Sequence, residues 1–358
     1  CIGHREVISL DYSPIIVSVQ ILAPTKEAIE LAVQQLVNHE LVGLPTETVY
    51  GLAADASSAE AVNKIFSAKD RPNDHPLIVH VRGARSNKQT QWTDILASWA
   101  REVSPPAIAL AMAAWPGPLT MILPRAKGVI DAVTGGQDTV GIRCPNHPVA
   151  QAVLEKFKGG IAAPSANRFG RISPTTAEHV KDEFVNHLDD LLILDGGSCE
   201  VGIESTIVDL CHWDTLGPII LRPGVITKAQ IEEWTGLVVG QKPATTTRHS
   251  GGMAAHYAPR TKLLLANDAQ AFEKLIQSTS GKIAWVGWSE PVSVNSQSNV
   301  DYLPFPKEPI EAAKVLYDLL RQLDKQSYDL LVFPELPNDE AWAGIKDRLN
   351  RAAVGSGV

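Results

Sequence analysis

The chain has 358 residues, of which 44% are hydrophobic and 20% charged, with 26 glycines and 24 prolines. This composition is typical of a globular protein and argues against a disordered, collagen-like or coiled-coil chain. The net charge of -8 excludes a protein that coats nucleic acid through a globally basic surface, although a local basic pocket is compatible with it. At roughly 150 residues per domain, the length predicts about two domains.

Four cysteines at positions 1, 144, 199 and 211 are too few for a disulfide framework, and no two of them form a CxxC pair. No uncharged apolar stretch approaches the roughly 18 residues that cross a membrane, and the first residues lack a basic segment followed by a long apolar run. We therefore expect a cytoplasmic protein in a reducing compartment.

The N-terminal part of the chain alternates helical and strand-like segments. Apolar residues at helical spacing predict an amphipathic helix over 25–39. Capping-box patterns at Ser57/Glu60, Thr175/Glu178 and Thr227/Gln230 predict three further helix starts. Short apolar runs predict strands at 41–44, 77–81, 119–123, 139–143, 161–163, 191–194, 205–210 and 218–221. Residues 83–93 show little pattern, and we expect an exposed insertion there.

The pattern changes after residue 238. Residues 239–260 are rich in Gly, Thr, Ser, Ala and Pro, which is typical of a linker. Beyond it, predicted strands at 262–266, 282–288 and 329–334 alternate with predicted helices at 268–278, 309–325 and 339–353. Repeated βα units predict a small, Rossmann-like parallel sheet, which lacks the GxGxxG pattern of a dinucleotide binder. We therefore divide the chain into domains at 15–238 and 261–358, joined by the linker 239–260.

Small polar residues follow or precede several predicted strands of the first domain: Thr46 and Thr48, Ser165 and Asn167, Ser205 and Thr206. Hydroxyls and amides at strand ends are suited to hydrogen-bonding a ligand in a groove above a sheet. Turn and cap chemistry is the more ordinary explanation of any one such group.

Four basic residues lie beside strands or proline-rich turns: Lys69, Arg71, Arg143 and Arg222. Arginine offers a fork of donors to carboxylate or phosphate, and lysine a compact charge. Taken singly each is more often a solvated surface charge, but together they indicate an anion site. His80 lies in an apolar run and is compatible with either a core position or the groove. The other histidines show no metal-ligand spacing, so we assign no metal site to protein side chains.

Seven motifs in order carry a resemblance to a known family. They are PTETVYGLAADA (45–56), KDRP with HPLIVHV (69–81), WPGPLTMIL (115–123), DTVGIRCPNHP (138–148), APSANRFGRISPTTAEHV (163–180), GIESTIVD (202–209) and LRPG (221–224). Together they resemble the YrdC-like domain of the threonylcarbamoyl-AMP synthases. HYAP at 256–259, followed by a βα domain, is similar to the long, two-domain form of that family. The resemblance implies an α/β fold with a twisted mixed sheet and a concave active-site groove.

The resemblance also implies an activity, the nucleotidyltransferase synthesis of threonylcarbamoyl-AMP and pyrophosphate from L-threonine, bicarbonate and ATP. The product would feed the tRNA threonylcarbamoyl-transferase machinery, which modifies ANN-decoding tRNAs, and a tRNA contact is compatible with this role. Carbamate attack on the α-phosphorus needs positioned reactants and positive charge, with no protein nucleophile. Mg²⁺ would enter on the ATP phosphates, and no organic prosthetic group is implied.

The resemblance assigns roles to individual residues. It places Lys69, Arg71, Ser165 and Asn167 at the centre of the chemistry and threonine at Thr48, His80, Arg143 and Ser205. It implies an ATP site formed by Arg71, His75, Thr139, Ser165, Asn167, Thr175, Arg222 and Tyr257, with Tyr257 or His256 closing over the nucleotide. Family linkers often carry a basic residue before HYAP, where this chain has Ala254 and Ala255.

Two other interpretations stay open. YrdC-like domains have a positive concave surface, so the chain could be a double-stranded RNA or tRNA-binding module without synthase activity, although its acidic balance argues against broad RNA affinity. The hydrogenase maturation proteins also contain a YrdC-like domain, but they carry zinc-finger cysteine pairs, which this chain lacks.

Overall fold

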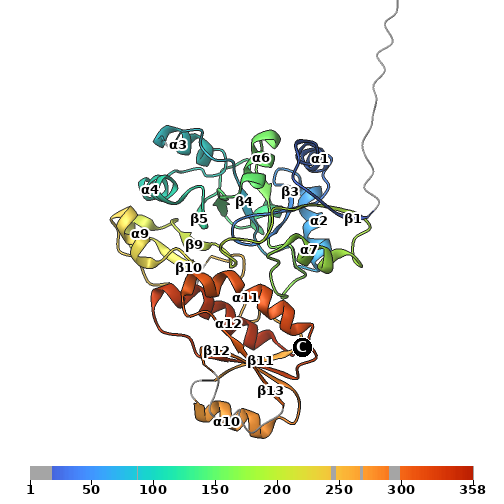
Figure 1. Ribbon diagram of the computed structural model, residues 1–358. Coiled ribbons are helices and arrows are strands. Elements are labelled where there is room, and N and C mark those ends of the chain that lie inside the picture. The colour runs from blue at the N-terminus through green and yellow to red at the C-terminus, as the bar shows by residue number, and fades with distance from the viewer. Residues whose placement is uncertain (1–17, 87, 243–246, 267–268, 290–298, 358) are drawn as a thin grey trace, which may run out of the picture.

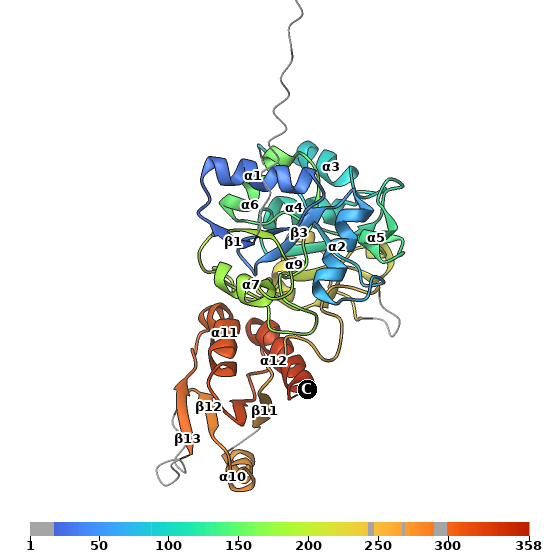
Figure 2. The ribbon, with the colours of Figure 1, turned by 90° about the vertical axis from the view of Figure 1, so that its right-hand side faces the viewer.

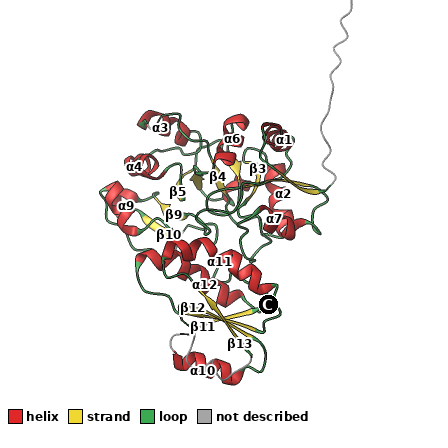
Figure 3. Cartoon of the chain, viewed as in Figure 1, coloured by secondary structure: helices red, strands yellow, loops and turns green. Residues whose placement is uncertain are grey.

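The computed structural model describes residues 18–86, 88–242, 247–266, 269–289 and 299–357. Two β-sheets with their covering helices lie one above the other in the view of Figure 1. The α/β class expected from the sequence is confirmed, and Figure 3 shows helices and strands interspersed along both parts. Within the described ranges, no helix is both long and apolar enough to span a bilayer.

Among the described residues, ten strands form the first sheet in the order β1-β8-β2-β3-β7-β4-β6-β5-β9-β10, with parallel and antiparallel pairs. These strands are β1 (Val19–Leu22), β2 (Val42–Leu44), β3 (Gly51–Asp55), β4 (Ile78–His80), β5 (Leu119–Pro124), β6 (Thr139–Arg143), β7 (Ile161–Ala162), β8 (Leu191–Leu194), β9 (Thr206–Asp209) and β10 (Ile219–Arg222). Most of their residues are buried, as expected for a sheet covered on both faces.

The helices of this part are α1 (Lys26–Val37), α2 (Ala59–Lys69), α3 (Gln89–Ala97), α4 (Pro105–Ala114), α5 (Asp131–Thr134), α6 (Pro148–Phe157), α7 (Ala177–Phe184), α8 (Trp213–Leu216) and α9 (Lys228–Thr235). Alternate residues of β8 show how the helices use the sheet. Leu192 and Leu194 join a core with α1 and α6, whereas Leu191 and Ile193 join a core with α2 and α7. The continuous apolar run of this strand is thus explained by burial on both faces.

The second sheet is parallel throughout, with the strand order β11-β14-β12-β13 among the described residues. Its strands are β11 (Lys262–Ala266), β12 (Ile283–Gly287), β13 (Val300–Pro304) and β14 (Leu330–Pro334), and its helices are α10 (Ala269–Ser278), α11 (Pro309–Asp324) and α12 (Ala343–Gly355), preceded by the 3₁₀ turn η2 (Glu340–Trp342). In Figure 2, α11 and α12 lie between this sheet and the first part of the chain, while α10 lies at the far end.

Several local predictions need correction. β13 was not predicted, because only one apolar-rich strand was expected between 279 and 308. Two helices begin one residue later than their capping patterns suggested: Ser58 caps α2 and Thr176 caps α7. Ser57 is instead engaged with Asp55, to which its hydroxyl donates at 2.7 Å. The third capping box, at Thr227 and Gln230, is confirmed.

The segment 83–93 is not simply an exposed insertion. From Gln89 it enters helix α3, whose Trp92 is 1% exposed and packs edge-on against Trp115 with ring centroids 5.7 Å apart. Trp92 and Leu96, both buried, anchor this helix to the core, and Leu96 lies beyond the segment that was judged from the sequence.

The proposed domain boundaries stay a prediction. Residues 15–17 of the first domain, 243–246 of the linker and Asp268, where a helix was expected to begin, lie outside the described residues.

Candidate active site

Nine of the residues singled out from the sequence line one narrow cavity of about 40 Å³. They come from six strand ends, from the loop after α2 and from the linker: Thr48, Arg71, His80, Arg143, Ser165, Ser205, Arg222, His256 and Tyr257. The strand register explains why they meet. His80 ends β4 opposite Arg143, which ends β6 and faces Thr120 of β5 on its other side. Thr120 in turn lies 2.8 Å from the hydroxyl of Ser205, oxygen to oxygen.

The turn between β2 and β3 is organised by its own hydroxyls. Thr46 Oγ1 donates to the backbone oxygen of Val49 at 2.6 Å and lies 2.9 Å from Thr48 Oγ1. This self-contained turn is the cap chemistry that such residues commonly provide. It leaves Thr48, which has no exposed surface, at the cavity wall.

Arg143 has a buried partner that the sequence did not reveal. Its Nη2 lies 2.8 Å from Glu47 Oε1, and both side chains are about 5% exposed or less. Glu47 lies between the two threonines of the β2–β3 turn, and the 96 residues that separate it from Arg143 hid the pairing. Because the pair is buried, each charge offsets the desolvation of the other, and breaking it would be costly.

Lys69 ties the end of α2 to the loop that follows β7. Its ammonium group donates to the backbone oxygen of Ser165 at 2.5 Å and to that of Asn167. Burial, followed by the charge of Arg71, holds the pKa of Lys69 well below its usual value. The amide of Asn167 donates to the backbone oxygens of Arg168 and Arg171 at 2.7 and 2.9 Å, so Asn167 shapes this loop while its Oδ1 has no partner among the described residues.

Two arginines present charge to the cavity. Arg71 donates to the backbone oxygen of Pro76 at 3.1 Å, and Arg222 donates to the oxygens of Ser205 and Ser250 at 2.9 to 3.2 Å. Burial lowers the pKa of both side chains, that of Arg71 to about 10. Over the described ranges, neither arginine forms an ion pair with a carboxylate, so their part of the cavity wall is suited to a polyanion.

His80 is buried and neutral. Burial, with the charge of Arg143, lowers the pKa of His80 to about 3. A neutral imidazole beside an arginine adds hydrogen-bonding capacity without adding charge.

The linker closes the cavity. Ser250, Gly251, His256 and Tyr257 all contribute to its wall. Gly251 has a φ of +74°, and a Cβ there would lie 2.4 Å from Tyr257 Oη, so only glycine fits this contact. The hydroxyl of Ser250 donates to the backbone oxygen of Pro76 at 2.9 Å, and Arg248 pairs with Asp74 at 3.1 Å.

Five predicted site residues lie outside the cavity wall. Lys69 lines a separate cavity of about 640 Å³, and Asn167 is in the lining of neither cavity. His75 packs on Phe169, with ring centroids 5.5 Å apart, and Thr175 Oγ1 lies 3.4 Å from His179 Nδ1. Thr139 begins β6, at the end of that strand opposite to Arg143. The roles assigned to these residues stay predictions, as do those of the residues in the wall.

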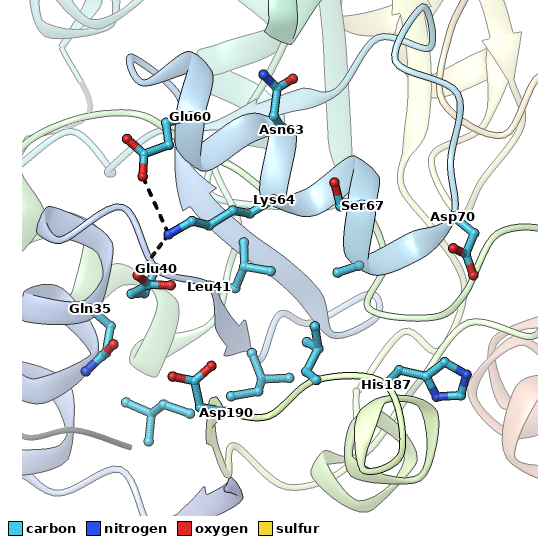
Figure 4. Close-up of a pocket in the computed structure, with 14 residues that line it drawn as sticks. Gln35, Glu40, Leu41, Glu60, Asn63, Lys64, Ser67, Asp70, His187 and Asp190 are labelled. Atoms are coloured by element: carbon cyan, nitrogen blue, oxygen red, sulfur yellow. Dashed lines mark hydrogen bonds and ion pairs between the residues drawn. The ribbon is translucent and has the colours of Figure 1, made fainter. Parts of the chain in front are cut away.

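A larger cavity of about 550 Å³ lies between α1, α2 and β8 (Figure 4). Its lysine, Lys64, pairs with Glu40 at 2.8 Å and Glu60 at 3.7 Å. This cavity contains none of the predicted site residues. The narrow cavity, which gathers them, is therefore the candidate active site.

Comparisons with known proteins identify the family of the chain. Residues 34–224 match the family described as telomere recombination, and residues 226–354 match the threonylcarbamoyl-AMP synthase C-terminal domain. Threonylcarbamoyl-AMP synthase of Pyrococcus abyssi is 34% identical over 88% of this chain and 90% of its own length. The enzyme of that name from Bacillus subtilis is 36% identical over 93% of this chain and 95% of its own.

A solved structure shares the fold. The crystal structure of P. abyssi Sua5 complexed with L-threonine matches with a TM-score of 0.81 and 32% identity, covering 95% of this chain and 98% of that one. The resemblance drawn from the seven motifs is thus confirmed over nearly the whole chain. The chain belongs to the threonylcarbamoyl-AMP synthase family and is an enzyme of the nucleotidyltransferase type.

Proposed function

We propose that this chain makes L-threonylcarbamoyl-AMP and pyrophosphate from L-threonine, bicarbonate and ATP. The observation that carries the proposal is that one cavity gathers two kinds of cation. Arg143 has a buried carboxylate partner, Glu47, whereas Arg71 and Arg222 form no ion pair with a carboxylate among the described residues. We assign the first end of the cavity, around Arg143, to an amino acid and the second end, around Arg71 and Arg222, to a triphosphate.

Threonine binds at the first end. Thr48, His80 and Ser205 offer hydrogen bonds, and the guanidinium of Arg143 offers its fork to the substrate carboxylate. Because Glu47 already balances the charge of Arg143, a zwitterionic amino acid can enter without leaving a buried charge unpaired.

ATP binds at the second end. The threonine amine and bicarbonate condense to a carbamate with loss of water, and a carbamate oxygen then attacks the α-phosphorus as pyrophosphate leaves. Negative charge builds on the leaving phosphates, which Arg71, Arg222 and Lys69 stabilise. Mg²⁺ arrives on the ATP phosphates as part of the substrate, and Ser165 and Asn167, with His75, Thr139, Thr175 and Tyr257, complete the predicted nucleotide contacts.

The linker acts as a lid. A cavity of about 40 Å³ holds little more than one water molecule, which occupies about 30 Å³, so ATP enters only when residues 247–257 move. Closure over bound substrates then excludes water from a hydrolysable adenylate. The adenylate then passes to a tRNA-modifying transferase, which uses it to make threonylcarbamoyladenosine in tRNA.

The test is a reaction with purified chain, Mg²⁺, ATP, L-threonine and ¹⁴C-bicarbonate. We expect pyrophosphate release that depends on both threonine and bicarbonate, with label in a product that contains AMP. Omission of each substrate is the control. Pyrophosphate that forms without threonine, or none at all, would contradict the proposal, and salt-sensitive tRNA binding without synthesis would favour the RNA-binding alternative.

A further inference from the structure

One arginine of the C-terminal part lies fully buried against the loops that line the cavity. Arg348 of α12 has no exposed surface. Its Nε donates to Glu204 Oε2 at 2.8 Å, its Nη2 to the backbone oxygen of Glu204 at 3.3 Å and its Nη1 to that of Pro223 at 2.7 Å. Its guanidinium carbon lies 5.3 Å from the ring centre of Tyr257. One side chain thus contacts the GIES, LRPG and HYAP segments together.

The carboxylate of Glu204, which lines the cavity, is fully engaged. Tyr317 of α11 donates to its Oε2 at 2.9 Å, and Ser173 donates to its Oε1 at 2.5 Å. Burial opposes ionisation, but the charges of Arg348 and Arg222 and the bond from Ser173 outweigh it, so the pKa of Glu204 falls to about 2. Glu204 is therefore a fixed anion at the cavity wall.

Glu204 and Arg222 line the same cavity, and Arg222 donates at 2.9 Å to the backbone oxygen of Ser205, the residue that follows Glu204. Arg222 nevertheless donates its hydrogen bonds to the oxygens of Ser205 and Ser250. The carboxylate oxygens of Glu204 accept hydrogen bonds from Tyr317, Arg348 and Ser173 instead. Without Arg348, the buried carboxylate would lose its closest cation, and Arg222 would become its main source of compensation. An arginine held by a carboxylate binds a phosphate less well.

Two glycines show that the C-terminal helices are closely docked at this point. A Cβ on Gly344 of α12 would lie 3.0 Å from the backbone oxygen of Gly224, which follows Pro223. Gly202, with a φ of +81°, lies so close to α11 that a Cβ would be 2.5 Å from the backbone oxygen of Ala313. The close backbone contacts at Gly202 and Gly224 fix the position of α11 and α12, and so the position from which Arg348 contacts Glu204 and Pro223.

We propose that Arg348 is a positioning residue of the active site: it neutralises Glu204 and so leaves Arg222 free to bind the nucleotide's phosphates. This gives the C-terminal part an indirect role in nucleotide binding. The identity of the anion rests on the proposed function.

The test compares the full chain with Arg348→Met, Glu204→Gln and the double variant. Steady-state kinetics give KM for ATP and for threonine, and calorimetry gives the affinity for α,β-methylene-ATP, which needs no turnover. In Arg348→Met we expect KM for ATP to rise, and affinity for the analogue to fall, by about tenfold, because removing one partner leaves a buried charge uncompensated. KM for threonine should stay close to that of the unmodified chain, because Arg348 forms no hydrogen bond with Thr48, His80, Arg143 or Ser205.

The double variant separates charge compensation from general loosening. Adding Glu204→Gln to Arg348→Met removes the stranded carboxylate, so nucleotide affinity should recover in large part. The control is Lys325→Ala. It removes an exposed ion pair across the same interface, in which Lys325 Nζ lies 2.7 Å from Asp182 Oδ2, and it should leave ATP affinity unchanged.

Unchanged nucleotide affinity in Arg348→Met, an equal loss for threonine and ATP, or no recovery in the double variant would overturn the proposal. If thermal unfolding shows that Arg348→Met does not fold, Arg348→Lys decides. Lysine keeps the positive charge but loses the forked guanidinium group. We therefore expect ATP affinity to fall by less than the tenfold predicted for Arg348→Met. No loss of ATP affinity at all would contradict the proposal. An unmodified chain that binds the analogue yet makes no adenylate would count against the proposed reaction alone.

Discussion

Replacing Lys69 with methionine should lower kcat/KM by about 10²- to 10³-fold, the range found when one electrostatic donor is removed from a transition state. Methionine keeps the apolar stem but loses the ammonium group that holds the backbone oxygens of Ser165 and Asn167. Both the local positive charge and the shape of the PSAN loop are lost together. Arg71→Ala should have an effect of similar size, since Arg71 is one of the cations at the phosphate end. Pyrophosphate release under saturating threonine and bicarbonate measures both.

The matched control lies on the same helix. Lys64 of α2 is half-buried and paired with Glu40 and Glu60 in the larger cavity of Figure 4. Lys64→Met should leave turnover unchanged. Unchanged turnover in Lys69→Met, or an equal loss in Lys64→Met, would remove Lys69 from the catalytic centre.

Acid should weaken the fold before the carboxylates titrate. Burial, the largest cause in each case, lowers the pKa of His80 to about 3 and that of His179 to about 4. Above an unfolded pKa near 6.5, both states leave these histidines neutral. As the pH falls below that value the unfolded chain takes up protons that the folded chain cannot, and stability is lost until the folded pKa is reached. From pH 7 to pH 5, each histidine should cost about 2 kcal/mol of unfolding free energy.

Urea denaturation at the two pH values measures the loss. His179→Gln removes one of these titrations, so the difference between pH 7 and pH 5 should shrink by about 2 kcal/mol. If the unfolding free energy of His179→Gln falls between pH 7 and pH 5 by as much as that of the unmodified chain, the lowered pKa of His179 is contradicted. Glu204, with a folded pKa of about 2, loses its contribution only below about pH 4.5, outside this window.

The proposed movement of the linker should respond to acid by the same physics. Burial lowers the pKa of His249 to about 4 and that of His256 to about 3. If the linker leaves the cavity as proposed, either side chain is protonated more easily there, so acid should favour the open linker.

The limits of β6, β8 and β11 were predictable to the residue. β8 shows a clear signal, because its four residues are apolar and buried and polar residues flank them. β1 and β3 were not predicted. Helices without an amphipathic stripe were not predictable either. α4 is apolar over most of its surface, and most of its residues are buried, so no period marks it.

The residues of the candidate site also fall into those that could be predicted from the sequence and those that could not. Residues that carry a charge or hydroxyl at a strand end, such as Arg143 and Ser205, could be named from the sequence, because the register of neighbouring strands brings such ends together. Glu47, Glu204 and Arg348 could not. Their importance comes from partners on other elements, 96 residues away for Glu47 and 144 residues away for Glu204 and Arg348, and no local pattern reports such pairs.

The most direct test of the central claim, that threonine and ATP meet in the narrow cavity, is a crystal structure of the chain with threonine and α,β-methylene-ATP. We predict threonine beside Thr48, His80 and Arg143, phosphates beside Lys69, Arg71 and Arg222, and a displaced linker. Nucleotide in the larger cavity beside Lys64, or threonine away from Arg143, would contradict the account.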